Sequence, residues 1–188
     1  MNKIFLVGRI SSEIVLNHFI GDNDYYSFQV KTKRLSLVDD TLTVIIYGKT
    51  IRKLKLMKDD FINIDGEIRT CNQNGHVKVY VYPYFIEKTL LPYKDEVTIT
   101  GRICKDPINR LTPFGTEITD LILEVGDKSE HLNFIPTVVW NSNARKCNNY
   151  NKGDYVFVKG RLQSREYTKE DEVKTAIELS VSEINRTE

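Results

Sequence analysis

Cationic and aromatic side chains alternate with apolar ones in residues 153–167, GDYVFVKGRLQSREY. Side chains of a β-strand point to opposite faces in turn, so this pattern predicts a strand with one apolar face and one face of rings and cations. The apolar face would carry Val156, Val158, Gly160 and Leu162, and the other face Tyr155, Phe157, Lys159, Arg161, Gln163, Arg165 and Tyr167. Such a face suits a single nucleic-acid strand, because cations bind phosphates and rings stack on unpaired bases. The alternative is an ordinary half-exposed strand whose cations are solvated.

Catalytic chemistry has little support in the sequence. His18, His76 and His131 each lack a neighbouring Cys, His or carboxylate at metal-ligand or triad spacing, and no P-loop, GxSxG or HExxH motif is present. Two pairs of adjacent carboxylates, Asp39–Asp40 and Asp59–Asp60, fall where turns or helix ends are expected. We therefore expect a protein that is not an enzyme and that holds no metal or cofactor.

The cysteines and the apolar runs indicate a cytoplasmic protein. Cys71, Cys104 and Cys147 are scattered, odd in number and outside any CxxC pattern, which favours a reducing compartment over a disulfide framework. No run approaches the roughly 20 apolar residues of a membrane span. The opening segment MNKIFLVGRI lacks a small-residue cleavage site and fits a strand better than a signal peptide.

Three blocks of the chain occur twice in the same order. Residues 60–69, DFINIDGEIR, align with residues 154–163, DYVFVKGRLQ, at an offset of 94. VGRI at 7–10 matches TGRI at 100–103, and VIIYGK at 44–49 matches TVVWNS at 137–142, both at an offset of 93. So long a period indicates two duplicated domains and not a solenoid. We predict one domain in residues 1–88 and a second in 94–188.

Both halves share one order of elements, three strands, a helix and two strands. In the first half we expect strands at Lys3–Ile10, Tyr25–Arg34 and Thr41–Tyr47, a helix in Lys49–Lys58, and strands at Asp60–Arg69 and Val77–Tyr84, with a loop at Asn17–Asp24 and a turn at Asn72–Gly75. After a linker at Glu87–Asp95, we expect strands at Glu96–Ile103, Thr116–Val125 and Phe134–Trp140, a helix within Ser142–Tyr150, and strands at Tyr155–Tyr167 and Val173–Ser182. This arrangement predicts an all-β chain of two tandem five-stranded OB-fold barrels.

Charge alone does not decide between partners. The net charge is +1, but residues 1–93 carry 13 Lys and Arg against 10 Asp and Glu, whereas 94–188 carry 14 against 16. Phosphate binding depends on where cations cluster. The better ring candidates lie on the repeated third-strand block, where Tyr47 and Trp140 are equivalent and Phe134 shares the parity of Trp140. Arg9 and Arg102 are also equivalent, and each either contacts a phosphate or supports the glycine before it.

The second half closely resembles the bacterial single-stranded DNA-binding protein family, through GRICKDPINRLTPFG, FIPTVVW and KGDYVFVKGRLQSREY. The first half resembles it more distantly, through VGRI, IIYGK and DGEIRT. This family is an established example of strand binding by OB-folds, in which rings stack on bases while Lys and Arg follow the backbone. The resemblance implies three stacking rings in the second half and five phosphate-binding cations, namely Phe134, Trp140 and Tyr167, with Arg102, Arg110, Lys159, Arg161 and Arg165.

The first half departs from this pattern, because Lys159, Arg161, Arg165 and Tyr167 align with Asp65, Glu67, Cys71 and Gln73. If the first half binds a strand, it uses other residues, for which the candidates are Tyr25, Lys31, Lys33, Arg34 and Tyr47, besides Arg9. Otherwise it serves mainly in assembly.

The resemblance also implies partners. We expect single-stranded DNA as the ligand, in replication, recombination or repair, and a homodimer, because the family commonly assembles four OB domains. The chain stops at SEINRTE, so no acidic C-terminal tip is expected. The alternative is an OB-fold interaction module of a primosome or of a phage or plasmid replication complex.

Overall fold

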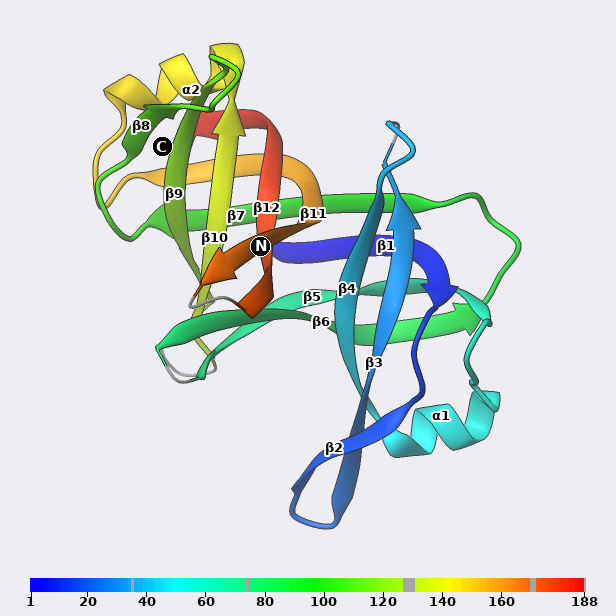
Figure 1. The fold of residues 1–188 in the computed structure, drawn as a ribbon. Coiled ribbons are helices and arrows are strands. Elements are labelled where there is room, and N and C mark those ends of the chain that lie inside the picture. Colours follow the sequence, from blue (N-terminus) through cyan, green and yellow to red (C-terminus); the bar gives the residue numbers. More distant parts are fainter. Residues whose placement is uncertain (35, 74, 127–130, 170–171, 188) are drawn as a thin grey trace. The chain divides into compact units, whose positions relative to one another are not determined.

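The computed structural model describes residues 1–34, 36–73, 75–126, 131–169 and 172–187. These residues form two compact units. The N-terminal unit comprises Ile4–Arg69 and Tyr80–Asp95, and the C-terminal unit comprises Met1–Lys3, Thr70–Val79 and Glu96–Glu188. Figure 1 shows the course of the strands and the positions of helices α1 (Gly48–Leu54) and α2 (Asn141–Lys146) along the chain.

The N-terminal unit closes a barrel of five strands. It holds β2 (Val15–Ile20), β3 (Asn23–Lys33), β4 (Asp39–Tyr47) and α1 (Gly48–Leu54). It also holds residues 4–10 of β1 (Asn2–Ile10), 61–69 of β5 (Phe61–Gln73) and 80–88 of β6 (His76–Lys88). Neighbouring strands follow the order β1, β3, β4, β6 and β5, and β5 pairs with β1 again. The pairing of β4 with β6 is parallel, and β1 pairs antiparallel with β3 and β5, as β3 does with β4. Strand β2 adds to the edge of β3. Helix α1 stands between the third and fourth barrel strands, as predicted.

The C-terminal unit repeats this topology. It comprises β7 (Lys94–Ile103), β8 (Ile108–Leu111), β9 (Glu117–Val125), β10 (Asn133–Trp140), α2 (Asn141–Lys146), the 3₁₀ helix η1 (Cys147–Asn149), β11 (Tyr155–Lys169) and β12 (Glu172–Arg186). The ring runs β7, β9, β10, β12 and β11, and β11 pairs with β7 again. The pair of β10 with β12 is the parallel one, and β8 adds to the edge of β9. The prediction of two five-stranded OB-type barrels is confirmed.

The glycines of the repeated blocks mark where barrel strands approach most closely. A Cβ atom on Gly8 would lie 2.4 Å from the carbonyl oxygen of Lys31, and one on its equivalent Gly101 would lie 2.9 Å from that of Glu124. On the fourth barrel strands, Gly160 is the tightest, because a Cβ there would lie 2.1 Å from the carbonyl oxygen of Ser180. Strand crossings of this kind require residues without a side chain, which explains why the two halves share these blocks.

The core follows the predicted parity. Val156 and Val158 are fully buried and Leu162 is 1% exposed, whereas Tyr155 on the opposite parity is 56% exposed. The apolar side of β11 therefore fills the barrel of the C-terminal unit, and its other side carries exposed residues such as Tyr155. The pattern of residues 153–167 is confirmed as a strand with an apolar inner face.

Several element limits were predicted wrongly. The loop expected at Asn17–Asp24 is largely β-hairpin, because β2 and β3 pair from Val15 to Ser27 around a turn whose Gly21 has a φ of +57°. The helix expected to reach Lys58 ends at Leu54, since Lys55 adopts a left-handed conformation with a φ of 49°. Strand β8 was not predicted, and the linker is shorter than expected because β6 runs to Lys88 and β7 begins at Lys94.

Candidate nucleic-acid interface

The strand register gathers most of the predicted residues of the second half on one outer face of the C-terminal unit. Directly paired residues point to the same side of a sheet. Phe134 pairs with Glu124, which also pairs with Arg102, and Arg110 pairs with Ile118, the partner of Trp140. On the other side of β10, Val138 pairs with Ser180, and Ser180 pairs with Arg161. The predicted residues that share this face are Arg102, Arg110, Phe134, Trp140, Arg161, Arg165 and Tyr167.

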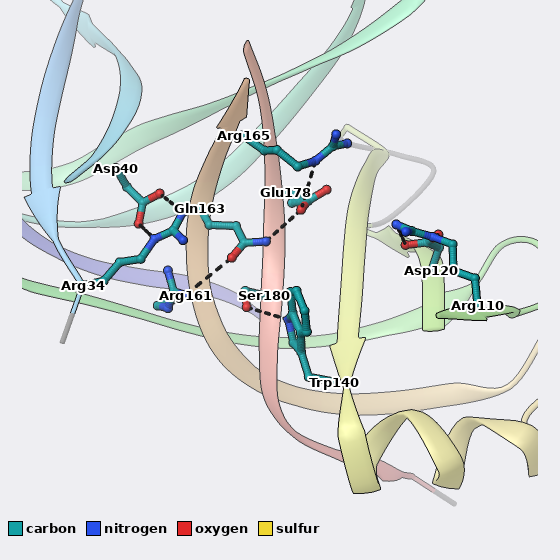
Figure 2. A network of polar contacts seen from close by, with 10 residues as sticks. All are labelled: Arg34, Asp40, Arg110, Asp120, Trp140, Arg161, Gln163, Arg165, Glu178 and Ser180. Atoms are coloured by element: carbon teal, nitrogen blue, oxygen red, sulfur yellow. Dashed lines mark hydrogen bonds and ion pairs between the residues drawn. The ribbon is translucent and has the colours of Figure 1, made fainter. Parts of the chain in front are cut away.

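Polar contacts fix the two aromatic residues of β10, through the indole edge of Trp140 and through the backbone of Phe134. The indole Nε1–H of Trp140 donates to the Ser180 hydroxyl at 3.0 Å, so the half-buried ring has a fixed polar edge (Figure 2). The backbone N–H of Phe134 donates to the Thr70 hydroxyl at 2.9 Å, while the ring itself is 37% exposed. Both rings therefore sit on an ordered strand with surface left for a flat partner, which is the requirement for base stacking.

Arginines on this face make forked contacts with carboxylates. The Arg102 guanidinium donates to both carboxylate oxygens of Glu124, at 2.7 and 2.9 Å from Nη2. Arg110 donates to both oxygens of Asp120, at 2.5 Å from Nε and 3.1 Å from Nη2. These hydrogen bonds and the attached negative charge raise the pKa of both guanidinium groups, which stay charged. The same fork geometry would fit a phosphate.

A chain of polar contacts crosses β11 and β12 (Figure 2). Arg161 donates to the Gln163 side-chain oxygen at 3.4 Å, and the Gln163 amide donates to Glu178 at 2.7 Å. Arg165 approaches the same carboxylate at 3.7 Å and lies 5.8 Å from the centroid of the Tyr167 ring. The predicted grouping of rings with cations on this strand is thus present, with Glu178 among them.

Lys159 lies on the outward parity of β11 at a point where the register with β12 shifts by one residue. Its ammonium group is 3.7 Å from a carboxylate oxygen of Glu183 and 5.7 Å from the Phe157 ring centroid. It is therefore on the same strand as Arg161, across the bulge from the contacts described above.

The register of the N-terminal unit brings together five of the six residues predicted there. Tyr25 pairs with Tyr47 across β3 and β4, and Lys31 pairs with Arg9 of β1, so these side chains share the outward face. Lys33 is on the same parity of β3, with its ammonium group 5.5 Å from the Tyr93 ring centroid. The Arg9 guanidinium lies 3.3 Å from the Asp59 carboxylate.

Arg34 is not brought together with these residues. Its side chain forms a bidentate ion pair with Asp40, at 2.7 Å from Nε and 2.6 Å from Nη2. The Asp40 side chain is 1% exposed and that of Arg34 is 23% exposed. The arginine therefore neutralises a buried carboxylate, and this structural role was not foreseen from the sequence.

A ring cluster in the N-terminal unit was missed. The His18 and Tyr25 rings are stacked with centroids 5.0 Å apart and planes within 3°, and Tyr25 lies 5.7 Å from Tyr47 and 6.3 Å from Tyr82. The Arg69 guanidinium covers the Tyr82 ring at 3.9 Å. Burial and a hydrogen bond with Tyr25 raise the pKa of Tyr82 to about 12. We call these residues, His18, Tyr25, Tyr47, Arg69 and Tyr82, the N-terminal ring cluster.

A usable pattern for Tyr82 was present in the sequence. Val79 and Val81 are buried, so the alternation KVYVYPY places Tyr80, Tyr82 and Tyr84 on the opposite parity. At the repeat offset of 94, however, Tyr82 aligns with Ala176. The repeat therefore contains no second ring at this position.

The described residues hold neither a metal-ligand cluster nor a membrane-spanning helix. No group of three or more His, Cys, Asp or Glu side chains among them could hold a metal ion. Neither of the two α-helices in the described part of the chain has the length and hydrophobicity that a membrane-spanning helix needs.

Topology and outer-face chemistry together define a tandem OB-fold protein with rings and cations on one face of each barrel. The model of the single-strand binding protein family matches residues 95–187. Single-stranded DNA-binding protein 3 of Clostridium acetobutylicum is 33% identical over an alignment of 96 positions, and the match covers 47% of this chain and 67% of that protein. The chain belongs to the single-strand binding protein family.

Two further comparisons place the family match on the chain. The single-stranded DNA-binding protein of Clostridium tetani is 37% identical over an alignment of 84 positions, and the match covers 41% of this chain and 58% of that relative. Over the whole chain, the wild-type single-stranded DNA-binding protein of Thermus aquaticus matches with a TM-score of 0.81 and 20% identity, covering 93% of that structure. This likeness shows that the tandem fold is shared.

Proposed function

We propose that this chain binds single-stranded DNA non-catalytically, in the replication, recombination or repair of DNA in the bacterial cytoplasm. The observation that carries the proposal is the register that places Phe134, Trp140 and Tyr167 on one outer face with Arg102, Arg110, Arg161 and Arg165. Family membership supports the same conclusion, since the relatives are named single-stranded DNA-binding proteins. We further propose residues 1–88 and 94–188 as its two OB domains.

Base stacking and phosphate contacts would both contribute to the affinity of this face for a DNA strand. Base–ring stacking contributes about 1–3 kcal/mol per engaged base and tolerates any sequence, because every base has a flat face. Phosphate contacts release counterions, so the affinity falls with salt by a slope of about 0.7 per contact on a log–log plot for single strands. Lys159 lies next to this face and would extend the phosphate track.

The test is a titration of fluorescein-labelled oligo-dT at two salt concentrations with wild-type protein, Trp140→Ala and Trp140→Phe. We expect salt-sensitive binding by the wild type and a loss of about tenfold or more in Trp140→Ala, since one stacking partner is removed. Trp140→Phe keeps a ring and should retain most of the affinity. Absence of binding by folded wild-type protein at low salt would reject the function, and equal affinity of all three proteins would remove Trp140 from the site.

For the N-terminal unit, we propose that Tyr25, Tyr47, Lys31, Lys33 and Arg9 form a second strand-binding face together with the ring cluster. Tyr47 is the most direct probe, because it pairs with Tyr25 and its hydroxyl donates to Asn23 at 3.0 Å. Tyr47→Ala should weaken oligo-dT binding by about fivefold or more, whereas Tyr47→Phe should not. Unchanged affinity in Tyr47→Ala would leave the C-terminal unit as the principal binding unit.

We also propose a homodimer, which would bring four OB domains together. The chain has a mass of 21.8 kDa, so light scattering should give twice that mass in the absence of DNA. A monomer mass across the concentration range would reject this part of the proposal without affecting DNA binding.

A further inference from the structure

Several cations predicted for the C-terminal unit lie against a carboxylate. Arg102 contacts Glu124, Arg110 contacts Asp120, Arg165 contacts Glu178 and Lys159 contacts Glu183. Arg161 donates to Gln163, which itself donates to Glu178. The outer face thus carries anions beside the cations that are predicted to bind phosphates.

Three of these carboxylates belong to the face that carries the rings. Asp120 and Glu124 are on the outward parity of β9, and Glu178 is on that of β12. The side chains of Glu124 and Glu178 are only 18% and 17% exposed, although their arginine partners are 41% and 56% exposed. The guanidinium groups are therefore accessible to solvent while the acids beneath them are largely covered.

A phosphate approaching this face must compete with the acids already present. If it takes over a guanidinium fork, a largely covered carboxylate loses its cation, which is unfavourable. If it binds beside the ion pair, the like charge of the carboxylate repels it. Either way, a phosphate contact here yields less affinity than the same cation without its acid. The rings are not subject to this competition.

We propose that Asp120, Glu124 and Glu178 are internal competitors of phosphate, which limit the affinity of this face for polyanions that present no unpaired bases. The inference rests on the proposed binding of single-stranded DNA. With the electrostatic contribution reduced, a ligand has to supply bases for Phe134, Trp140 and Tyr167. A base-free polyanion such as inorganic polyphosphate cannot do so and binds poorly.

The decisive comparison uses two substitutions on the same strand. Glu124→Gln removes the competitor of Arg102, and Glu117→Gln makes the same chemical change where Glu117 pairs with Arg145 of α2, on the opposite parity of β9. Both are isosteric and both change the net charge by one. We expect Glu124→Gln to tighten oligo-dT binding about threefold, and Glu117→Gln to leave it nearly unchanged.

The combined variant Asp120→Asn, Glu124→Gln, Glu178→Gln enlarges the effect. Its oligo-dT affinity should show a steeper salt dependence, by a log–log slope of about 2 for three freed cations. Inorganic polyphosphate should displace labelled oligo-dT poorly from the wild type and at about tenfold or more lower concentration from the variant. Thermal unfolding of each variant checks that the fold is kept.

The results of these experiments distinguish a failure of this inference from a failure of the function on which it rests. Wild-type protein that fails to bind oligo-dT would overturn both. Wild-type binding together with equal effects of Glu124→Gln and Glu117→Gln, and an unchanged salt slope in the combined variant, would overturn the competitor role alone.

Discussion

The two units share one strand order but arrange their outward side chains differently. In the N-terminal unit the rings contact one another, with Tyr25 within 5.0 to 6.3 Å of His18, Tyr47 and Tyr82 and the Arg69 guanidinium over the Tyr82 ring. In the C-terminal unit Phe134 and Trp140 are six residues apart on β10, and the arginines around them are held by carboxylates. One surface is built from rings in contact and the other from rings among ion pairs.

This difference shows which parts of the fold are constrained. Closing a barrel requires inward apolar residues and glycines at the strand crossings, so these features recur in both halves. The outer face has no such requirement. Where β11 has Lys159 and Arg161, β5 has Asp65 and Glu67, and Glu67 accepts hydrogen bonds from Arg69 and from the Tyr84 hydroxyl. The acid that replaces a cation in the repeat therefore supports the N-terminal ring cluster.

The largest effects are expected at the shared glycines. A Cβ on Gly160 would lie 2.1 Å from the Ser180 carbonyl oxygen, so Gly160→Ala must displace backbone and should lower the free energy of unfolding by about 3 kcal/mol or more. Urea unfolding followed by the fluorescence of Trp140, the only tryptophan, reports on this unit directly.

Substitution of the glycine on the first barrel strand should destabilise the two units to different extents. A Cβ atom on Gly8 would lie 2.4 Å from the Lys31 carbonyl oxygen, whereas a Cβ atom on Gly101 would have its nearest neighbour at 2.9 Å. Gly8→Ala should therefore cost more stability than Gly101→Ala, as measured by urea unfolding with far-ultraviolet circular dichroism. The opposite order would mean that the N-terminal crossing can open more easily than the distances indicate.

The sequence predicted the features that depend on local pattern or on repetition. Alternation located the buried side of β11, and the repeat located the glycines and the helix position. Ion pairs such as Arg102 with Glu124 join residues 22 apart through the barrel register, which no local pattern determines. Tyr82 was missed because its ring has no counterpart in the repeat. The ion pair of Arg34 was not foreseen because its acid, Asp40, was expected at a turn or a helix end.

A further prediction contrasts a buried ion pair with an exposed one. Arg34→Met removes the bidentate partner of a carboxylate that is 1% exposed, which should lower the stability of the N-terminal unit by about 3 kcal/mol. Arg110→Met leaves Asp120, which is 38% exposed, and should cost less than about 1 kcal/mol. Urea unfolding followed by circular dichroism measures both.

The double variant Arg34→Met, Asp40→Asn provides the control for this contrast. It also removes the buried negative charge and should recover part of the lost stability, because a neutral amide is less costly to bury. No recovery, or equal losses in Arg34→Met and Arg110→Met, would show that burial of the acid does not govern the effect.

A smaller effect than that of Arg34→Met is expected in alkaline stability. Burial raises the pKa of the Cys147 thiol to about 11 from an ordinary value of 9.0, and that of Tyr82 is raised to about 12 from 10.0. A raised pKa means that the folded state holds the proton more tightly, so the stability it contributes is complete below the ordinary pKa and is lost as the pH rises through the folded value. The C-terminal unit should therefore weaken from pH 9 to 11, and the N-terminal unit only from pH 10 to 12.

Cys147→Ala isolates the contribution of the thiol, which is 1% exposed and donates to the Asn143 carbonyl oxygen at 3.3 Å. The wild type should lose about 2 kcal/mol more than this variant between pH 9 and 11, a difference that urea unfolding followed by Trp140 fluorescence can resolve. Lysine deprotonation occurs in both proteins and cancels in the comparison. If the free energies of unfolding of the two proteins fall in parallel over this pH range, the thiol ionises without opening the C-terminal unit. The proposed order of alkaline unfolding would then rest on Tyr82 alone.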